Sequence, residues 1–481
     1  MTDLVLGIDV GTQGARAIVV DGSGDVIAQT SEPFSIEPVQ LPPSYAEQHP
    51  DEWWRAASAC LRRVTKEIGG SIAAIAVDST SGTIVAVDAD GTPLRPAIMY
   101  NDGRAVAEAE IANKLGHEHT DKLGYRFNAS FGLPKILWIR DHEPEVFQVA
   151  RFIHAADYIV GKLTGEFGLT DSSNALKTGY DSADYKWPEF ILAEIGRDKL
   201  PDVREPGALL GEVSRYCAEE TGLQAGTPVM AGVSDGTAGF IASGAAAIGD
   251  WNSTLGTTLV MRGISRHLLL DPLGRFYSHR HPDGWWLPGG ASNVGAECLV
   301  KIFPDEDLDA LAVQIDDSMP TGLLVYPLVR CGERLPFVDP EAQGFVLGDA
   351  DSRAQLFGAY LEGVAFVERW ILETAGSLGA DTSGSIFTTG GGAKSSVWMK
   401  IRASVLNRRV CRPEVSECAF GSAIVAASRT LYPNLTEAGR NMVRVDCAIE
   451  PEPALVAAYD ALYGRFRAEC SLRYNVSSRR A

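Results

Sequence analysis

Several features are scarce or missing in this sequence of 481 residues. No apolar run approaches the ~18 residues that cross a bilayer, so we expect no membrane-spanning helix. The eight cysteines form no C-x-x-C pair, which argues against a zinc ribbon or a dithiol redox site. The start of the chain also lacks the basic and apolar segments of a secretory signal. Buried free thiols in a reducing cytoplasm are therefore the expectation.

Positive charge is also in short supply. The chain has 43 Lys and Arg residues against 62 Asp and Glu residues, for a formal net charge of −19. Binding to nucleic acid requires clustered basic side chains, and the strip formed by Arg408, Arg409 and Arg412 is too short to provide them. We expect small-molecule partners, with neither nucleic acid nor a membrane among them, and a monomer or a homodimer.

The length and composition are those of a globular protein with more than one core. Hydrophobic residues make up 45% and charged residues 22% of the chain. A single core rarely exceeds ~250 residues, so two domains with a cleft between them are expected. Small residues dominate near 245–250, and we predict an N-terminal domain over 1–246, a second domain over 247–435 and a packed C-terminal helical extension over 436–481.

Short apolar runs that end in polar, glycine-rich tips recur along the chain, which indicates an α/β fold. An amphipathic helix is predicted over 51–68 and another helix over 152–163. The predicted strand-and-tip units are a hairpin over 4–20, a hairpin over 72–87, a strand and small-residue helix over 229–244, a hairpin over 253–261 and a strand with a glycine loop over 386–394. The recurrence suggests two halves of similar architecture.

The first tip, Gly7-Ile8-Asp9-Val10-Gly11-Thr12-Gln13-Gly14-Ala15-Arg16, has the composition of a phosphate-binding loop. Its glycines let backbone N–H groups approach a phosphate chain, and Thr12 adds a hydroxyl donor. Asp9 would orient Mg²⁺ or its waters. A plain glycine-rich turn is the alternative. The loop is not a Walker loop, because G-x-x-x-x-G-K-[ST] is absent.

Taken together, the motifs resemble those of the FGGY family of carbohydrate kinases, within the sugar kinase, Hsp70 and actin superfamily. The matching segments occur in family order over nearly the whole chain: GIDVGTQGAR, YAEQHPDEWW, YNDGR, DYIVGKLTGE, GVSDG, STLGTT and GGGAKSSVW. The resemblance implies a two-domain fold of the ribonuclease H-like type, with two mixed sheets, flanking helices and an interdomain cleft. It also implies ATP as the co-substrate with Mg²⁺, the sugar on the first domain and the adenosine on the second.

The resemblance assigns roles to individual residues. Asp235 matches the aspartate that acts as general base, and Asp9 matches a second catalytic and substrate-binding aspartate that contacts the metal of Mg-ATP through water. The positions implied for phosphate and ATP are Gly11, Thr12, Gln13, Gly14, Arg16, Gly256, Thr257, Thr258, Gly391, Gly392, Ala393, Ser395 and Trp398. Those implied for the substrate are Asp9, Thr80, Ser81, Tyr100, Asn101, Asp102, Arg104 and Asp235.

One departure from the family pattern bears on the substrate. Xylulokinases usually carry Met-His-Gly where this chain has Thr80-Ser81-Gly82. This variant, with NALKTGYD, YSHRHPDGWWLPGGASN and GERLPF, resembles the D-ribulose kinase branch. We therefore expect phosphorylation of the terminal 5-hydroxyl of D-ribulose. D-xylulose, ribitol, glycerol or a deoxy-ketose are the alternative substrates.

Other interpretations remain open at this stage. A filament-forming actin relative and a chaperone ATPase belong to the superfamily but would not be expected to carry this motif set. A sugar-binding pseudokinase is the other alternative, although Asp9, Thr12 and Asp235 are all present. His279 and His281 form either a structural pair or part of a metal site. Asn293 and Gly295 are candidates for lining the nucleotide cleft, and Trp398 would either flank adenine or belong to the core.

Overall fold

The computed structural model describes residues 3–35, 40–474 and 476, which form two compact units. Unit 1 comprises Met1–Ala242, His279–Gly284 and Val415–Arg444, and unit 2 comprises Ser243–Ser278, Trp285–Glu414 and Val445–Ala481. Unit 1 therefore includes a late segment that the predicted division into 1–246, 247–435 and 436–481 assigned elsewhere. No helix among the described residues is both long and apolar enough to span a membrane.

Unit 1 is built on a six-stranded sheet with the order β11-β12-β5-β1-β2-β3. Its strands are β1 (Leu4–Val10), β2 (Gly14–Asp21), β3 (Val26–Pro33), β5 (Ile72–Ser79), β11 (Leu209–Glu212) and β12 (Pro228–Ser234). A four-stranded sheet has the order β4 (Glu47–Gln48), β7 (Ala97–Ile98), β6 (Ile84–Val87) and β8 (Arg151–His154), and β9 (Leu169–Asp171) pairs with β10 (Asp202–Arg204).

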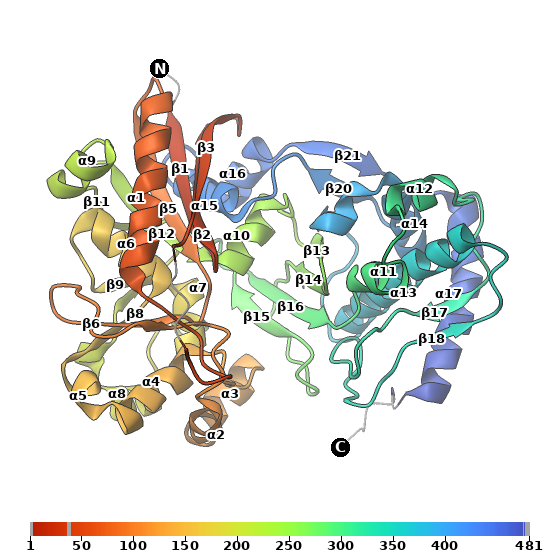
Figure 1. The fold of residues 1–481 in the computed structure, drawn as a ribbon, viewed down its shortest axis with the longest axis horizontal. Coiled ribbons are helices and arrows are strands. Elements are labelled where there is room, and N and C mark those ends of the chain that lie inside the picture. The colour runs from red at the N-terminus through yellow and green to blue at the C-terminus, as the bar shows by residue number, and fades with distance from the viewer. Residues whose placement is uncertain (1–2, 36–39, 475, 477–481) are drawn as a thin grey trace. The chain divides into compact units, whose positions relative to one another are not determined.

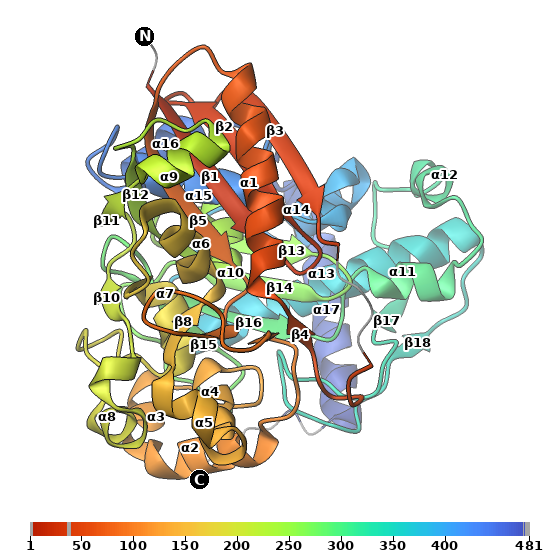
Figure 2. The same ribbon diagram turned by 60° about the vertical axis from the view of Figure 1, so that its left-hand side comes forward.

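Helices cover both faces of the large sheet of unit 1, with α1 on one face and α15 on the other (Figures 1 and 2). The helices of this unit are α1 (Pro50–Glu67), α2 (Val106–Leu115), α3 (His117–Leu123), α4 (Gly132–His142), α5 (Pro144–Val149), α6 (Ala155–Thr164), α7 (Ser172–Ala175), α8 (Glu189–Ile195), α9 (Arg215–Thr221), α10 (Asp235–Ala242), α15 (Cys418–Ala427) and α16 (Leu435–Met442). Because side chains alternate along a strand, Leu6 and Ile8 pack into the core beneath α1, whereas Gly7 and Asp9 face α15.

Gly7 shows why the face toward α15 needs small residues. A Cβ atom at Gly7 would lie 1.8 Å from the main-chain oxygen of Ala419. No side chain fits at that separation, so glycine lets the helix lie directly on β1. This close approach brings α15, which is some 400 residues later in the chain, to the strands that carry the acidic residues of unit 1.

Unit 2 repeats the central arrangement of unit 1. Its sheet has the order β15 (Tyr277–Arg280), β16 (Trp286–Ser292), β14 (Leu259–Gly263), β13 (Trp251–Leu255), β19 (Ile386–Thr389), β20 (Val410–Pro413) and β21 (Val445–Ile449). The other elements are α11 (Glu297–Ile302), α12 (Leu308–Val313), β17 (Leu324–Tyr326), β18 (Phe345–Leu347), α13 (Arg353–Ser377), α14 (Ser396–Leu406) and α17 (Pro453–Arg473). In each unit the first strand of a hairpin also pairs with a parallel strand. In unit 1 the hairpin is β1–β2 and β1 pairs with β5; in unit 2 the hairpin is β13–β14 and β13 pairs with β19.

Most predicted elements are confirmed, including the hairpins over 4–20 and 253–261 and the helix over 51–68. The predicted hairpin over 72–87 is wrong. β5 pairs in parallel with β1 and β12, whereas β6 joins the smaller sheet and pairs with β8. The partners of both strands lie far away in sequence, so a local pattern cannot identify them. The helix predicted over 152–163 begins at Ala155, after strand β8.

Candidate active site

Three parallel strands of unit 1 end at the same edge of its sheet, and each end carries a carboxyl group. The register places Asp9 of β1 beside Asp78 of β5, and Asp78 beside Val233 of β12. Strand β12 ends at Ser234, and Asp235 begins α10 directly afterwards. The carboxyl ends of strands in open α/β sheets are the usual location of ligand sites. This edge is therefore the candidate catalytic edge.

Asp9 is held in place by the neighbouring strand of the hairpin. Arg16 lies opposite it in β2, and the guanidinium Nη1 donates to Asp9 Oδ2 at 2.9 Å. The Asp9 carboxyl is almost completely buried, whereas the Arg16 side chain is half exposed. Burial raises the pKa of Asp9, and the hydrogen bond and charge of Arg16 oppose that increase. Arg16 thus orients Asp9 and keeps one of its oxygens engaged.

Asp78 is a member of this edge that sequence reasoning missed. Its side chain is fully buried, and Ser422 Oγ on α15 donates to Asp78 Oδ2 at 2.5 Å. Burial, and next the nearby Asp9 carboxylate, raise the pKa of Asp78 well above the ordinary range. The available signal was the position of Asp78 at the end of an apolar strand, as for Asp9. Its partner Ser422 could not be found, because the sequence does not reveal that α15 packs here.

Asp235 combines proximity to this edge with partial exposure. Its Oδ1 accepts a hydrogen bond from the N–H of Gly236 at 2.7 Å, as expected at the start of a helix. Cys418 Sγ on α15 donates to the main-chain oxygen of Asp235 at 3.4 Å, which ties the start of α10 to α15. The Asp235 carboxylate is close enough to Asp78 to contribute to the raised pKa of Asp78. A partly exposed carboxylate on a fixed strand end is suited to accepting a proton from a ligand.

Side chains from outside the first hairpin hold its tip in place. Gly11 donates its N–H to the main-chain oxygen of Gly14 at 3.1 Å, and Gln13 is exposed. Gln48 Nε2 donates to the main-chain oxygen of Thr12 at 2.9 Å, and the indole N–H of Trp53 donates to Gln48 Oε1 at 2.8 Å. Gln48 and Trp53 belong to the YAEQHPDEWW segment, so this motif supports the tip.

The residues expected to bind the sugar differ in burial and in their hydrogen-bond partners. Thr80 and Ser81 are buried, and the hydroxyls of Thr80 and Thr83 are 2.9 Å apart. Thr83 Oγ1 also accepts from the N–H of Tyr100 at 3.1 Å, and Thr12 Oγ1 donates to the Tyr100 hydroxyl at 3.4 Å. Tyr100 therefore connects the first hairpin tip with the Thr80–Gly82 loop.

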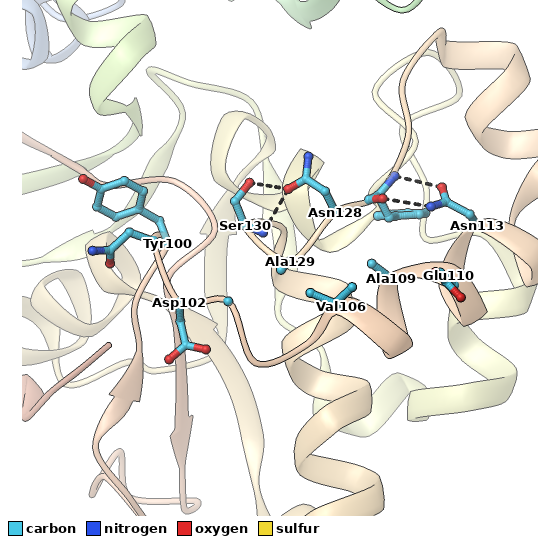
Figure 3. A pocket seen from close by; sticks show the side chains of 12 residues that line it. Tyr100, Asp102, Val106, Ala109, Glu110, Asn113, Asn128, Ala129 and Ser130 are labelled. Carbon is cyan, nitrogen blue, oxygen red and sulfur yellow. Dashed lines mark hydrogen bonds between the residues drawn. The ribbon is translucent and has the colours of Figure 1, made fainter. Parts of the chain in front are cut away.

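A cavity of about 530 Å³ extends from the Tyr100 segment. Figure 3 shows the side chains that line it: Tyr100, Asn101, Asp102, Gly103, Val106, Ala109, Glu110, Asn113, Phe127, Asn128, Ala129 and Ser130. Asn113 exchanges hydrogen bonds with the backbone of Phe127, and Asn128 Oδ1 accepts from the N–H and the hydroxyl of Ser130. These bonds fix the Phe127–Ser130 wall opposite α2.

Asp102 and Arg104, two of the residues expected to contact substrate, are paired with each other. Both oxygens of Asp102 accept hydrogen bonds from Arg104, at 2.9 and 2.8 Å. The Arg104 side chain is only 1% exposed, pairs with Glu47 at 2.7 Å and lies over the ring of Tyr45. All three nitrogens of the guanidinium thus have a carboxylate partner. The pair anchors the Tyr100–Asn101 segment, whose Asn101 remains exposed.

The expected phosphate and nucleotide residues outside the first hairpin lie in two adjacent loops of unit 2 or just after them. β13 and β19 are parallel, with Thr254 beside Thr389, so Gly256–Thr258 and Gly390–Ala393 follow from neighbouring strand ends. The first loop is fixed by backbone bonds, since Ala296 donates to Gly256 O at 2.8 Å. Gly295 packs beneath it, where a Cβ atom would lie 2.3 Å from the main-chain oxygen of Thr257. Gly391 is exposed, with nothing within 4 Å of a Cβ placed on it.

Three other residues expected near the nucleotide have structural partners. Trp398 is 2% exposed and donates its indole N–H to Leu361 O at 3.1 Å, which supports the core alternative for this residue. Ser395 Oγ accepts from the N–H of Trp398 and caps α14. The Asn293 side chain donates to Gly332 O at 2.9 Å, which joins the GGASN and GERLPF motifs.

Two arginines that support these loops were not predicted. Arg402 on α14 is fully buried, forms an ion pair with Glu368 at 2.8 Å and donates to the hydroxyls of Ser253 and Thr388 at 2.8 and 2.6 Å. It therefore connects β13 to β19 next to the strand ends that continue into the two loops. Arg412 donates to Ala393 O at 3.2 Å and holds the second loop.

The metal interpretation of His279 and His281 is not supported. His281 Nδ1 accepts a hydrogen bond from the N–H of Asp283 at 3.0 Å. Within the described ranges, no three His, Cys, Asp or Glu side chains come together as a metal site. Among the described residues, the acidic edge formed by Asp9, Asp78 and Asp235 is likewise not such a three-residue metal site.

Comparison with known proteins agrees with this arrangement. Residues 4–242 match the N-terminal domain, and residues 244–429 the C-terminal domain, of the FGGY family of carbohydrate kinases. A xylulose kinase of Bacillus subtilis is 28% identical over 96% of both chains, and a gluconokinase of the same organism is 28% identical over 89% of this chain and 88% of its own. The crystal structure of xylulose kinase from Rhodospirillum rubrum superposes with a TM-score of 0.86 at 29% identity over 98% of both chains. The chain belongs to the FGGY family of carbohydrate kinases, enzymes that transfer a phosphoryl group to an alcohol group.

Proposed function

We propose that this enzyme transfers the γ-phosphoryl group of ATP to the terminal 5-hydroxyl of a ketopentose, with D-ribulose as the main substrate. The observation that carries the choice of sugar is the Thr80-Ser81-Gly82 loop, which stands where xylulokinases usually carry Met-His-Gly. D-xylulose is the second candidate, favoured by the similarity to proteins named xylulose kinase. A gluconokinase has the same 28% identity over 89% of this chain, so identity alone does not select the sugar.

We assign the role of general base to Asp235. It is partly exposed directly after β12, whereas Asp78 and Asp9 are both buried. Of the three carboxylates, Asp235 can therefore reach a hydroxyl most easily. The base would accept the proton of the attacking hydroxyl as the phosphorus–oxygen bond forms, and ADP would leave with the electron pair of the bond that breaks.

We assign the phosphates of ATP to the loops Gly256–Thr258 and Gly390–Ala393 of unit 2. These loops combine glycine backbone with threonine hydroxyls, and such loops donate N–H groups to anions. Mg²⁺ requires oxygen ligands and is usually bound through one or two carboxylates together with substrate phosphates. The acidic edge fits that use, with Asp9 contacting Mg-ATP through a water. The ion would neutralise charge on the phosphates.

The experiment that tests this function is ADP release by the purified protein with Mg²⁺-ATP and a panel of acceptors. The panel is D-ribulose, D-xylulose, L-ribulose, ribitol, glycerol and no sugar. The Asp235→Asn variant, purified in the same way, reports contaminating kinases. We expect the largest kcat/KM with D-ribulose. A largest value with D-xylulose would correct the sugar, and no stimulation by any sugar would contradict the proposed function.

A further inference from the structure

Lys135 of α4 is a buried lysine that is separate from the three carboxylates of the acidic edge. Its side chain is 0% exposed, and Nζ donates to Gly82 O at 2.8 Å and to Ser130 O at 3.0 Å. These two carbonyls belong to different segments, one after β5 and one before α4. The ammonium group therefore joins two pieces of backbone that no described strand pairing connects.

This position is costly for a charged side chain. Within the described part of the chain, Lys135 donates to the neutral carbonyls of Gly82 and Ser130 rather than to a carboxylate. Burial, and next the positive charge of Lys177, lower the pKa of Lys135 well below the usual value, and Asp102 only partly opposes this. A hydrophobic residue of similar volume usually stabilises such a site more than a charge does. Residues that violate this rule tend to occur at functional sites.

The positions of the Gly82 and Ser130 carbonyls indicate what Lys135 does. Gly82 closes the Thr80–Gly82 loop with a positive φ of 89°, and a Cβ atom there would lie 2.2 Å from Ser130 O. The Thr80–Gly82 loop thus lies directly against the segment that includes Ser130. Ser130 in turn lines the cavity shared with Tyr100 and Asn101, as seen in Figure 3. Lys177 adds a weaker contact, since its Nζ donates to Ser81 O at 3.3 Å.

We propose that Lys135 is a positioning residue for the carbohydrate: it clamps the Thr80–Gly82 loop to the Asn128–Ser130 wall and thereby fixes the sugar-binding surface. The inference rests on the proposed function in one respect, namely that the Thr80–Gly82 loop contacts the sugar. The lysine turns the Gly82 and Ser130 carbonyls toward itself. It thereby determines which polar groups of both segments are presented to a ligand.

The test is Lys135→Met, which keeps the length of the side chain and removes its donors. We expect KM for the ketose to rise at least tenfold, with KM for ATP within twofold and kcat within threefold of wild type. The ratio of kcat/KM between D-ribulose and D-xylulose should fall at least fivefold, because a loose loop discriminates less between epimers. A merely structural role would instead lower kcat in proportion to the folded fraction. An unchanged ketose KM in folded Lys135→Met would overturn the proposal.

Two further variants keep the proposal testable. Lys199→Met is the matched control, since Lys199 also donates to a main-chain carbonyl, that of Gln148 at 2.8 Å, but does not touch either segment. It should leave all constants unchanged. If Lys135→Met does not fold, the partly exposed Lys177→Met decides: a roughly threefold rise in ketose KM alone supports the clamp, and no change contradicts it. Failure of wild type to respond to any sugar would instead refute the proposed function.

Discussion

The central strands of the two units are arranged alike, yet their ends carry different chemistry. In unit 1 the strand ends carry Asp9 and Asp78, followed by Asp235. In unit 2 the corresponding ends carry Thr254 and Thr389 and continue into glycine-rich loops. A shared backbone arrangement therefore supports an acidic edge in one unit and a neutral edge, rich in backbone donors, in the other.

The two edges also differ in what stabilises them. The acidic edge is supported by side chains on α15 and β2, in particular Ser422 and Arg16. The neutral edge is supported from behind by the buried ion pair of Arg402 and Glu368. We infer that unit 1 supplies the group that accepts a proton, whereas unit 2 supplies rigid backbone for phosphate. Each of the following predictions changes one side of this comparison.

The largest effect is expected for Asp235→Asn at the acidic edge. The amide keeps the shape of the side chain but cannot accept the proton, so kcat should fall about 1,000-fold. ATP affinity should stay within twofold of wild type. Steady-state ADP release and calorimetric titration with ATP measure the two quantities. Turnover close to wild type would show that another group is the base.

At the neutral edge, Arg402→Met should act on stability before chemistry. The substitution leaves the Glu368 carboxylate buried without its partner, at a cost of about 3 kcal/mol. The double variant Arg402→Met/Glu368→Met should recover much of that loss, because no isolated charge remains. Denaturant unfolding compares the three proteins. Equal stability of Arg402→Met and wild type would mean that the ion pair does not support this edge.

A buried carboxyl group of unit 2, that of Glu362, has a pKa near neutral and lies away from the neutral edge. Burial raises the pKa of Glu362 on α13 to about 7, although Thr321 and Tyr459 donate hydrogen bonds to it. The folded pKa lies above the unfolded value of ~4.3, so the folded state retains this proton up to higher pH. The contribution of Glu362 to stability is therefore present below about pH 4 and is lost as the pH rises through 7.

The corresponding variant is Glu362→Gln, whose amide resembles the protonated acid. Relative to this variant, wild type should lose about 2 kcal/mol of stability between pH 5 and pH 8. Thermal unfolding of both proteins at these two pH values measures the difference. The pH dependence of kcat should not change, because Glu362 is in the core. A pH-independent difference in stability would contradict the raised pKa.

The smallest effect is expected for Gly391→Val in the second loop of unit 2. The position is open, so folding should be unaffected, but a branched side chain would obstruct the approach of ATP to the backbone. We expect KM for ATP to rise about tenfold with the ketose KM unchanged. Gly392→Val is the contrasting variant, since a Cβ atom there meets Leu255 at 2.5 Å and should destabilise unit 2 itself.

The sequence was most informative where structure is local. The hairpins β1–β2 and β13–β14 combine apolar runs with glycine-rich tips, and both were predicted correctly. The pairing of β5 with β1 was not, because strand partners distant in sequence leave no local signal. The packing of α15 onto β1 was also beyond reach. It depends on contacts such as Gly7 against Ala419, which only the folded chain displays.

The same distinction applies to the candidate site. Family motifs located Asp9, Asp235 and the glycine loops, since these residues lie within recognisable segments. They could not show that Arg104 is buried and paired with Asp102 and Glu47, or that Trp398 is in the core. A motif specifies which residue occupies a position but not where its side chain points. Asp78, Lys135 and Arg402 were missed for the corresponding reason, because their partners are distant in sequence.

The most direct test of the division between the two edges is a crossed binding measurement. D-ribulose and Mg²⁺-ATP are titrated separately into Asp235→Asn and Gly391→Val and compared with wild type. The account predicts that Asp235→Asn binds ATP with wild-type affinity and that Gly391→Val binds the ketose with wild-type affinity but ATP about tenfold more weakly. If Gly391→Val instead weakens the ketose and leaves ATP unchanged, the neutral edge is not the nucleotide site and the account is wrong.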